Sequence, residues 1–576
     1  MPAEQLVPPL EQMRPAAESE LRDVVERFTH DREALYRRYD TDFSAERRAR
    51  FRTFYAQWSD RLAAADFDRL GMEGRVDFIL LNNRVRYELD LLRREEKLWG
   101  EMAPLIPFAA PLIALQEARR RFESLDPQRS AALLTTLTGD VARSRAAVER
   151  SLGPPERPGT PPSSDASTPA STRPSRIVAY RTIEALDGIK RTFASWYAYY
   201  SGYDPLFTWW LAQPYKRMTT ALTDYQRFLK ERVVGYKDGE DPPIVGDPIG
   251  ATGLAADLAV EMIPYTPAEL LAIGEREFAW CEAEMKKASR DMRLGDDWKR
   301  ALEQVKNSYV APGKQTEAVR DFAREAVAFV SSRNLVTIPP LADEVWRMEM
   351  MSPERQKVNP FFLGGEVILV SYPTDAMDQD DKMMSMRGNN PDFAKATVHH
   401  ELIPGHHLQG FMNERYHPHR QLFGTPFWHE GNSLYWEMLL WDLGFPTTPE
   451  QRVGMLFWRM HRAARIIFSL SFHLGTMTPQ QAIDFLVDRV GHERANAEAE
   501  VRRSFNGSYS PLYQVGYMIG GLQQRALRRE LVETGKMTDR AFHDAILQGG
   551  PMPIEMVRAR LTKQVLPQDF RTRWRF

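Results

Sequence analysis

The chain has 576 residues, 43% hydrophobic and 27% charged, as is ordinary for a globular protein. Its net charge of −2 gives no electrostatic case for nucleic acid or an anionic membrane as a partner. A single cysteine, Cys281, excludes a disulfide framework. The segment 1–14 has no apolar run, so we expect no signal peptide and no integral membrane segment. We expect a cytoplasmic location for the sequence as given, and a periplasmic or secreted location if a leader has been removed.

Helical periodicity dominates the chain. Apolar residues recur at spacings of three and four, for example over 18–28 and 78–92, which predicts a mainly α-helical fold. Residues 153–176 are rich in Pro, Ser and Thr and poor in apolar side chains, as is typical of a disordered linker. We therefore expect helical regions at 1–152 and 177–576 that pack together as one body.

Two stretches inside the second region depart from plain helix. Aromatic residues cluster from Trp196 to Tyr215, where they fill a core or line a peptide cleft, with core the preferred interpretation. Residues 364–373 read Gly-Gly-Glu-Val-Ile-Leu-Val-Ser-Tyr-Pro, a β-rich run bounded by helix breakers. We expect a strand there, in a small sheet beside the helix that follows. The edge of this strand at Val367–Val370 either forms backbone hydrogen bonds with an extended peptide or has only a structural role in the sheet.

The segment 399–407 reads His-His-Glu-Leu-Ile-Pro-Gly-His-His and predicts a metal site. The usual motif is His-Glu-x-x-His on one helix, with Glu as general base. Here the second histidine comes later, and a regular helix would turn His406 away from His400 and place His407 roughly 10 Å further along. Pro404 and Gly405 break that regularity. We predict a helix bulge that brings His406 to His400, with His407 as the alternative ligand.

A third ligand is expected from the next helix. Glu430 follows Glu401 by 29 positions, across a loop that allows an antiparallel return to the metal. Glu437 shares its helix face two turns on and is expected to orient a ligand histidine. The alternative for Glu430 is an acid that stabilises the helix N-terminus. Further on, Tyr513 and Tyr517 lie one turn apart at the start of an apolar helix.

These motifs resemble a known family. The run from His400 to Gln409, together with Glu-Gly-x-x-Leu-Tyr-x-Glu at 430–437, is similar to the bacterial family catalogued as domain of unknown function 885, which is grouped with the gluzincin metallopeptidases. The likeness covers most of the chain and extends to the following segments: 265–275, 462–465, His473, 477–482, 500–503, Pro511 and 517–520. A more distant likeness is to dipeptidyl peptidase III, whose motif is His-Glu-x-x-Gly-His. The present motif reads as that one with Pro404 added, which favours His406 over His407.

The resemblance implies a function. Tyr517 and His473 occupy the family's Tyr and His positions, which implies donors to the oxygen of a reacting carbonyl. We expect Zn²⁺ on His400, His406 and Glu430 and hydrolysis of bonds in short peptides, with Glu401 as general base. One alternative is a metal-dependent amidase acting on a non-peptide small molecule. Another is a peptide-binding protein with a degenerate site.

Overall fold

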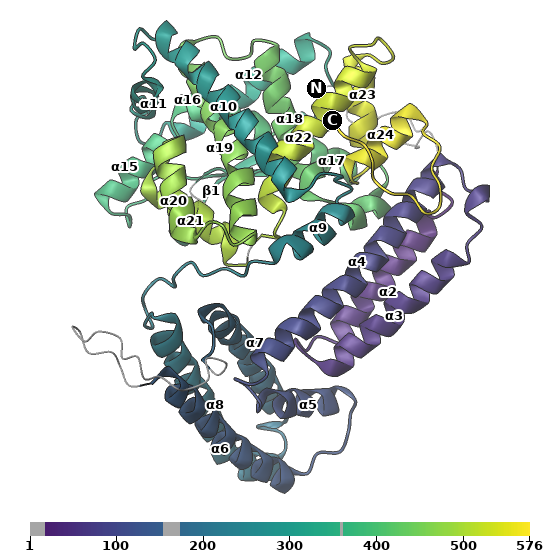
Figure 1. Cartoon of the computed structure of the whole chain (residues 1–576), viewed down its shortest axis with the longest axis vertical. Helices are drawn as coiled ribbons and strands as arrows, with labels where there is room; N and C mark the ends of the chain where they lie inside the picture. The colour runs from purple at the N-terminus through teal and green to yellow at the C-terminus, as the bar shows by residue number, and fades with distance from the viewer. Residues whose placement is uncertain (1–17, 154–172, 357–360, 508) are drawn as a thin grey trace. The chain divides into compact units, whose positions relative to one another are not determined.

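The computed structural model describes residues 18–153, 173–356, 361–507 and 509–576 (Figure 1). Within these ranges the protein is mainly α-helical, which confirms the predicted fold class. Its strands, β1 (Arg347–Met350) and β2 (Val367–Val370), form a two-stranded parallel sheet. Most of the predicted linker, 154–172, lies outside the described residues. Across the described part, none of the helices has both the length and the apolar character needed to cross a membrane.

The chain divides into two compact units. Among the described residues, the larger unit comprises those up to 27, 66–84 and 248–576, and the smaller unit comprises those in 28–65 and 85–247. The division differs from the predicted one, in which a single body had its only break at 153–176. The physical reason is that the helices after that segment pack their apolar faces on those before it, so both belong to the smaller unit.

The smaller unit is a set of long helices, of which those after residue 102 share one core. Its elements are the greater part of α2 (Arg22–Arg38), α3 (Ala45–Ala63), the later part of α4 (Met72–Met102), α5 (Ala109–Arg120), α6 (Pro127–Leu152), α7 (Arg176–Tyr200), α8 (Pro205–Leu229) and η3 (Lys230–Val234). The aromatic run of α7 and α8 is divided. Trp196 and Phe207 are fully buried, whereas Tyr203 and Trp209 are 72% and 81% exposed. The core interpretation therefore holds for only part of that run.

The larger unit holds all the predicted metal ligands. Its elements are η2 (Phe67–Arg69), the start of α4, α9 (Gly250–Val260), α10 (Pro267–Asp291), α11 (Trp298–Lys306), α12 (Gln315–Ser332), α13 (Pro340–Val345), β1, α14 (Pro353–Gln356), β2, α15 (Gln379–Gly388), α16 (Pro391–Glu401), α17 (His406–Asn413), η4 (Pro418–Phe423), α18 (Pro426–Asp442), α19 (Pro449–His473), α20 (Pro479–Phe485), η5 (Leu486–Val490), α21 (Arg494–Phe505), α22 (Tyr513–Leu531), α23 (Asp539–Gln548) and α24 (Ile554–Thr562).

Helices α18 and α22 lie side by side in this unit and fix the position of the third predicted ligand (Figure 1). They approach closely because Gly431 faces Gly520. A Cβ on Gly431 would lie 2.6 Å from the Cα of Gly520, closer than side-chain carbons approach. Helix α18 is buried along most of its length, and α16 packs against both α18 and α19. The contact between α18 and α22 holds Glu430 next to the tyrosines of α22.

Candidate metal centre and its cavity

The helix that carries the first histidine is interrupted at Pro404. Helix α16 ends at Glu401 and α17 begins at His406, so the predicted bulge is in fact a full break between two helices. Pro404 has no N–H to offer the carbonyl of His400. That carbonyl accepts a hydrogen bond from Ser433 Oγ at 3.0 Å instead. The break is therefore supported from α18, which is an element that local sequence reasoning does not reach.

Gly405 closes the turn between the two helices. Its N–H donates to the carbonyl of His399 at 3.0 Å, and a Cβ at this position would overlap the carbonyl of His400. Only glycine permits so close an approach of backbone to backbone. The turn brings the ring of His406 to 4.8 Å from the ring of His400, centroid to centroid, with the two planes nearly perpendicular.

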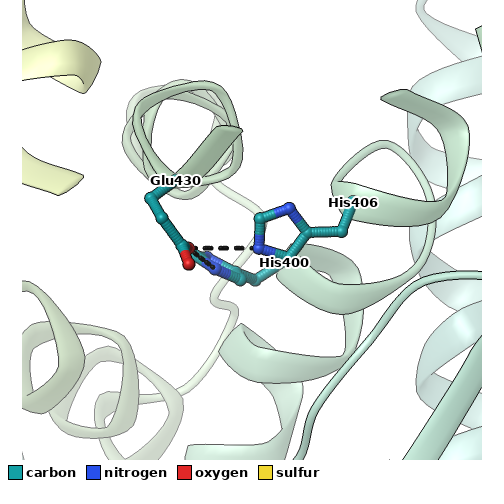
Figure 2. A group of neighbouring side chains, drawn as sticks. All are labelled: His400, His406 and Glu430. Carbon is teal, nitrogen blue, oxygen red and sulfur yellow. Dashed lines mark hydrogen bonds and ion pairs between the residues drawn. The ribbon is translucent and has the colours of Figure 1, made fainter. Parts of the chain in front are cut away.

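Three predicted ligands converge, as Figure 2 shows. Oε2 of Glu430 lies 3.1 Å from Nε2 of His406 and 3.4 Å from Nε2 of His400. The three ligand atoms all lie within 4.8 Å of one another. Zinc bonds of about 2.0–2.1 Å in tetrahedral geometry place ligand atoms roughly 3.3 Å apart. Two imidazoles and one carboxylate at these separations fit a zinc ion that keeps one position open.

Each of these three side chains is oriented by a hydrogen bond with a neighbouring side chain. Nδ1 of His400 donates to Oε1 of Glu437 at 2.6 Å, and Nδ1 of His406 donates to Ser433 Oγ at 3.3 Å. Both bonds leave Nε2 with the lone pair that a metal requires. The hydroxyl of Tyr513 donates to Oε1 of Glu430 at 2.5 Å, which leaves Oε2 facing the histidines.

The electrostatics of the centre follow from its burial and its charge pairs. Burial opposes a charge on His400, but Glu430 and Glu437 outweigh it and raise the pKa of His400 to about 9. Burial likewise opposes the charge of Glu430, yet His406 and His400 hold its pKa well below the usual value. Without a metal the centre therefore holds a proton on His400. Metal binding must release that proton.

Glu401 opens onto a cavity of about 400 Å³ that His400, His406 and Glu430 also line. Burial raises the pKa of Glu401, and the neighbouring histidines His400 and His406 oppose that shift. A carboxylate with a raised pKa beside a metal centre is suited to accepting and returning a proton. The backbone of α16 fixes Glu401 here, since its carbonyl accepts from the N–H of Gly365 at 3.3 Å.

Tyr517 also lines the cavity. Its ring stacks on the ring of His400, with centroids 6.1 Å apart and planes at 17°. Burial and Glu430 raise its pKa well above the usual value, so its hydroxyl keeps its proton. Tyr513 lines the same cavity and is engaged with Glu430. Of the two tyrosines, Tyr517 is the one placed to donate to a ligand in the cavity.

Two predicted histidines lie elsewhere. Nε2 of His407 donates to the carbonyl of Ala342 at 2.7 Å, so this side chain faces α13 and not the metal centre. His473 does not line the cavity, and it packs near Phe505 with its pKa lowered to about 4 by burial. The reason is distance along α19. His473 shares a face with Arg465 but lies two turns, roughly 12 Å, beyond it. His473 is therefore not in the position that its predicted role as a donor requires.

The predicted strand is present, but its edge is not open along its whole length. On one side β2 pairs with β1, with Val367 opposite Arg347. On the other side Leu363 and Leu369 exchange both backbone hydrogen bonds, at 3.1 and 2.7 Å. Residues 361–364, and not β2, line the cavity. An extended peptide would therefore meet this segment first, and the expectation for Val367–Val370 has to be revised.

Sequence reasoning missed Ser433 and a group of cavity arginines. Ser433 follows Glu430 by three positions and so shares its helix face, a spacing that could have been used. The arginines are Arg355, Arg462, Arg465 and Arg503, and all line the cavity. Arg462 and Arg465 have the same three-residue spacing on α19. Only the fold reveals that α14, α19 and α21 meet at one cavity.

Comparisons with known proteins agree with this architecture. The family model described as a bacterial protein of unknown function (DUF885) matches residues 30–561. A solved structure of "a putative lipoprotein of unknown function" from Shewanella oneidensis is similar, with a TM-score of 0.67 and 17% identity, over 95% of this chain and 100% of that one. A second, "the putative lipoprotein from Colwellia psychrerythraea", has a TM-score of 0.58 and 15% identity, over 94% and 98%. No curated protein is significantly similar to the chain.

Proposed function

The chain belongs to the DUF885 family of bacterial proteins of unknown function, and we propose that it is a zinc-dependent hydrolase of peptide bonds in short peptides. The observation that carries the proposal is the convergence of His400, His406 and Glu430, with Glu401 in the same cavity. Two histidines and a glutamate, with a further glutamate adjacent, are the ligands and base of many zinc peptidases. We propose on the same residues that the chain is a gluzincin.

In this proposal each side chain has one task. His400, His406 and Glu430 hold the ion, while Glu437, Ser433 and Tyr513 fix their orientation. When bound, zinc supplies a Lewis acid that polarises a carbonyl and makes water more acidic.

The remaining tasks belong to Glu401 and Tyr517. The carboxylate of Glu401 accepts a proton from the attacking water and passes it to the nitrogen of the departing amine. The hydroxyl of Tyr517 donates to the carbonyl oxygen as negative charge develops there.

We also infer where the protein acts. Both solved structures named above are called putative lipoproteins, and a covalently attached lipid anchors a protein at a membrane surface. This favours the periplasmic or secreted alternative over the cytoplasmic one. Fractionation of the native host, with antibody detection of the protein, tests the inference. A protein found wholly in the cytoplasm would contradict it.

Activity on a library of short peptides tests the proposed function. We expect cleavage that is lost after chelation, returns with one equivalent of zinc, and is absent in His406→Ala. His429→Ala is a matched control, since His429 lines the cavity without belonging to the ligand cluster. A panel of simple non-peptide amides serves as the rival substrate class. Cleavage of those amides alone would support the amidase alternative, and zinc binding without hydrolysis of either class would support the degenerate site.

A further inference from the structure

The cavity of the proposed metal centre is rich in guanidinium groups. Arg462 and Arg465 of α19 line it with only 5% and 1% of their surface exposed, and Arg503 of α21 lines it beside them. Arg355 of α14, which is exposed, also lines it. The carboxylates among the described lining residues are Glu401 and Glu430, which belong to the metal centre. The wall built by α19 and α21 is therefore cationic.

The carboxylates behind this cationic wall do not balance its positive charge. Glu500 accepts from Nε of Arg465 at 2.6 Å and also pairs with Arg503. Arg462 lies 3.8 Å from Glu437, whose same oxygen already accepts from His400. Arg462 and Arg465 thus rely on one carboxylate, which also pairs with Arg503, and on the edge of a second. Buried charge without full compensation is costly, so such a group persists where a ligand supplies the missing anion.

Two hydrogen-bond donors of this wall lack an acceptor among the described residues. They are Nε of Arg462 and Nη1 of Arg465, and both are buried. Most buried polar atoms in proteins are paired, so each such atom calls for an explanation. A carboxylate that enters the cavity would supply acceptors for both, because guanidinium groups bind carboxylates through parallel hydrogen bonds.

The cationic wall is close to the metal centre. The guanidinium carbons of Arg462 and Arg465 lie 4.6 and 4.3 Å from the centroid of the Tyr517 ring. The same ring stacks on His400. One side chain therefore separates the arginines from a metal ligand. An extended peptide advances roughly 3.5 Å per residue, so a chain end one or two residues beyond the cleaved bond spans this interval.

We propose that Arg462, Arg465 and Arg503 bind the free C-terminal carboxylate of the substrate. This inference rests on the proposed function, and it narrows the substrate class to short peptides with an unblocked C-terminus. Cleavage then releases one or two residues from that end. A peptide whose C-terminus is amidated loses the charge that the cationic wall recognises.

The test measures binding and does not require hydrolysis. Titration calorimetry on the zinc-loaded Glu401→Gln protein compares three ligands: N-acetyl-trialanine as the free acid, the same peptide as its amide, and the amide with glutamate as the last residue. Arg462→Lys and Arg465→Lys keep the charge but lose the planar fork. Arg459→Lys is the matched control, because Arg459 is buried on the same helix but pairs with Glu277 and stacks on Trp280.

We expect the free acid to bind about 10- to 100-fold more tightly than the amide, the range for hydrogen bonds to charged groups. The preference should fall below about threefold in Arg462→Lys and Arg465→Lys and persist in Arg459→Lys. Equal affinity for the free acid and the amide, or weak binding of both, would overturn the proposal. So would a loss of the preference for the free acid in Arg459→Lys as large as that in Arg462→Lys and Arg465→Lys. Preference for the glutamate amide over the free acid would overturn the C-terminal assignment. Acid preference without peptidase activity would refute the proposed function alone.

Discussion

The larger unit contains two buried clusters of charge that differ in one respect. One cluster, which we call the closed cluster, consists of Glu73, Asp77, His419, Arg420 and Arg560. Every nitrogen of Arg420 donates a hydrogen bond there: to Asp77 at 2.7 Å, to Glu73 at 2.6 Å and to the carbonyl of Gly549 at 2.7 Å. It joins segments far apart in sequence, and it is not among the groups that line the metal-centre cavity.

The other, the open cluster, consists of the metal centre and the arginines of its cavity. It has donors without acceptors among the described residues, and it faces about 400 Å³ of space. The difference teaches how to assign buried charge. In the closed cluster the central guanidinium, that of Arg420, is fully matched within the protein, and Nη1 of Arg560 finds no acceptor among the described residues but does not line the cavity. Charges matched in this way hold the fold together. Where donors remain unmatched on residues that line a cavity, as on Arg462 and Arg465, we assign the missing partner to a ligand.

The largest expected effect concerns the reaction. Glu401→Gln keeps the shape of the side chain but cannot accept a proton. We expect hydrolysis to fall by about 10²- to 10⁴-fold, while zinc affinity and melting temperature stay close to those of the parent. Steady-state kinetics with metal analysis checks this, and Glu414→Gln on the exposed end of α17 is the control. Full activity in Glu401→Gln would remove Glu401 from the mechanism.

The next effect contrasts the clusters directly. Arg420→Met removes a cation that bonds both Asp77 and Glu73, while His419 and Arg560 stay beside them, and we expect a loss of about 3–5 kcal/mol of unfolding free energy. Arg462→Met removes a cation whose pKa is already lowered by burial and by Arg465. Its cost should be below about 1 kcal/mol. Urea denaturation of both variants measures the contrast. Equal losses would show that the two clusters do not differ as we describe.

A smaller effect is the acid sensitivity of the closed cluster. Burial opposes the charge of Asp77, but His419 and Arg420 outweigh it and lower its pKa to about 2. A lowered folded pKa means stability that is present above the unfolded pKa and is lost as pH falls through the folded one. We therefore expect about 2 kcal/mol to disappear between about pH 4 and pH 2. The difference in unfolding free energy between the parent and Asp77→Asn should shrink over that window. A difference that stays constant with pH would refute this assignment.

Much of the open cluster could be predicted from the sequence because its residues lie in short motifs. The interruption at Pro404 follows from helix geometry and proline chemistry, the preference for His406 over His407 came from the resemblance to dipeptidyl peptidase III, and the structure brings His406 to His400. That Glu437 orients a ligand histidine was likewise expected from helix spacing, and the structure shows that this histidine is His400. These inferences depend only on contacts within a helix or between consecutive helices.

The rest depends on contacts between distant segments. Ser433 shares the helix face of Glu430, but this spacing does not reveal that Ser433 accepts from His406 while donating to the carbonyl of His400. The convergence of α14, α19 and α21 on one cavity and the division into two units are tertiary facts. The placement of His473 failed because a family position gives a residue type but no distance. The closed cluster, whose members span Glu73 to Arg560, has no sequence signature at all.

Zinc titration of two histidine variants tests the central claim most directly. His406→Ala removes a ligand whose Nε2 lies 3.1 Å from Glu430, whereas His407→Ala removes a hydrogen bond to the carbonyl of Ala342. We predict that the parent binds one zinc ion, that His406→Ala loses more than about 100-fold in affinity, and that His407→Ala loses less than this. Tight zinc binding by His406→Ala together with its loss in His407→Ala would contradict the account.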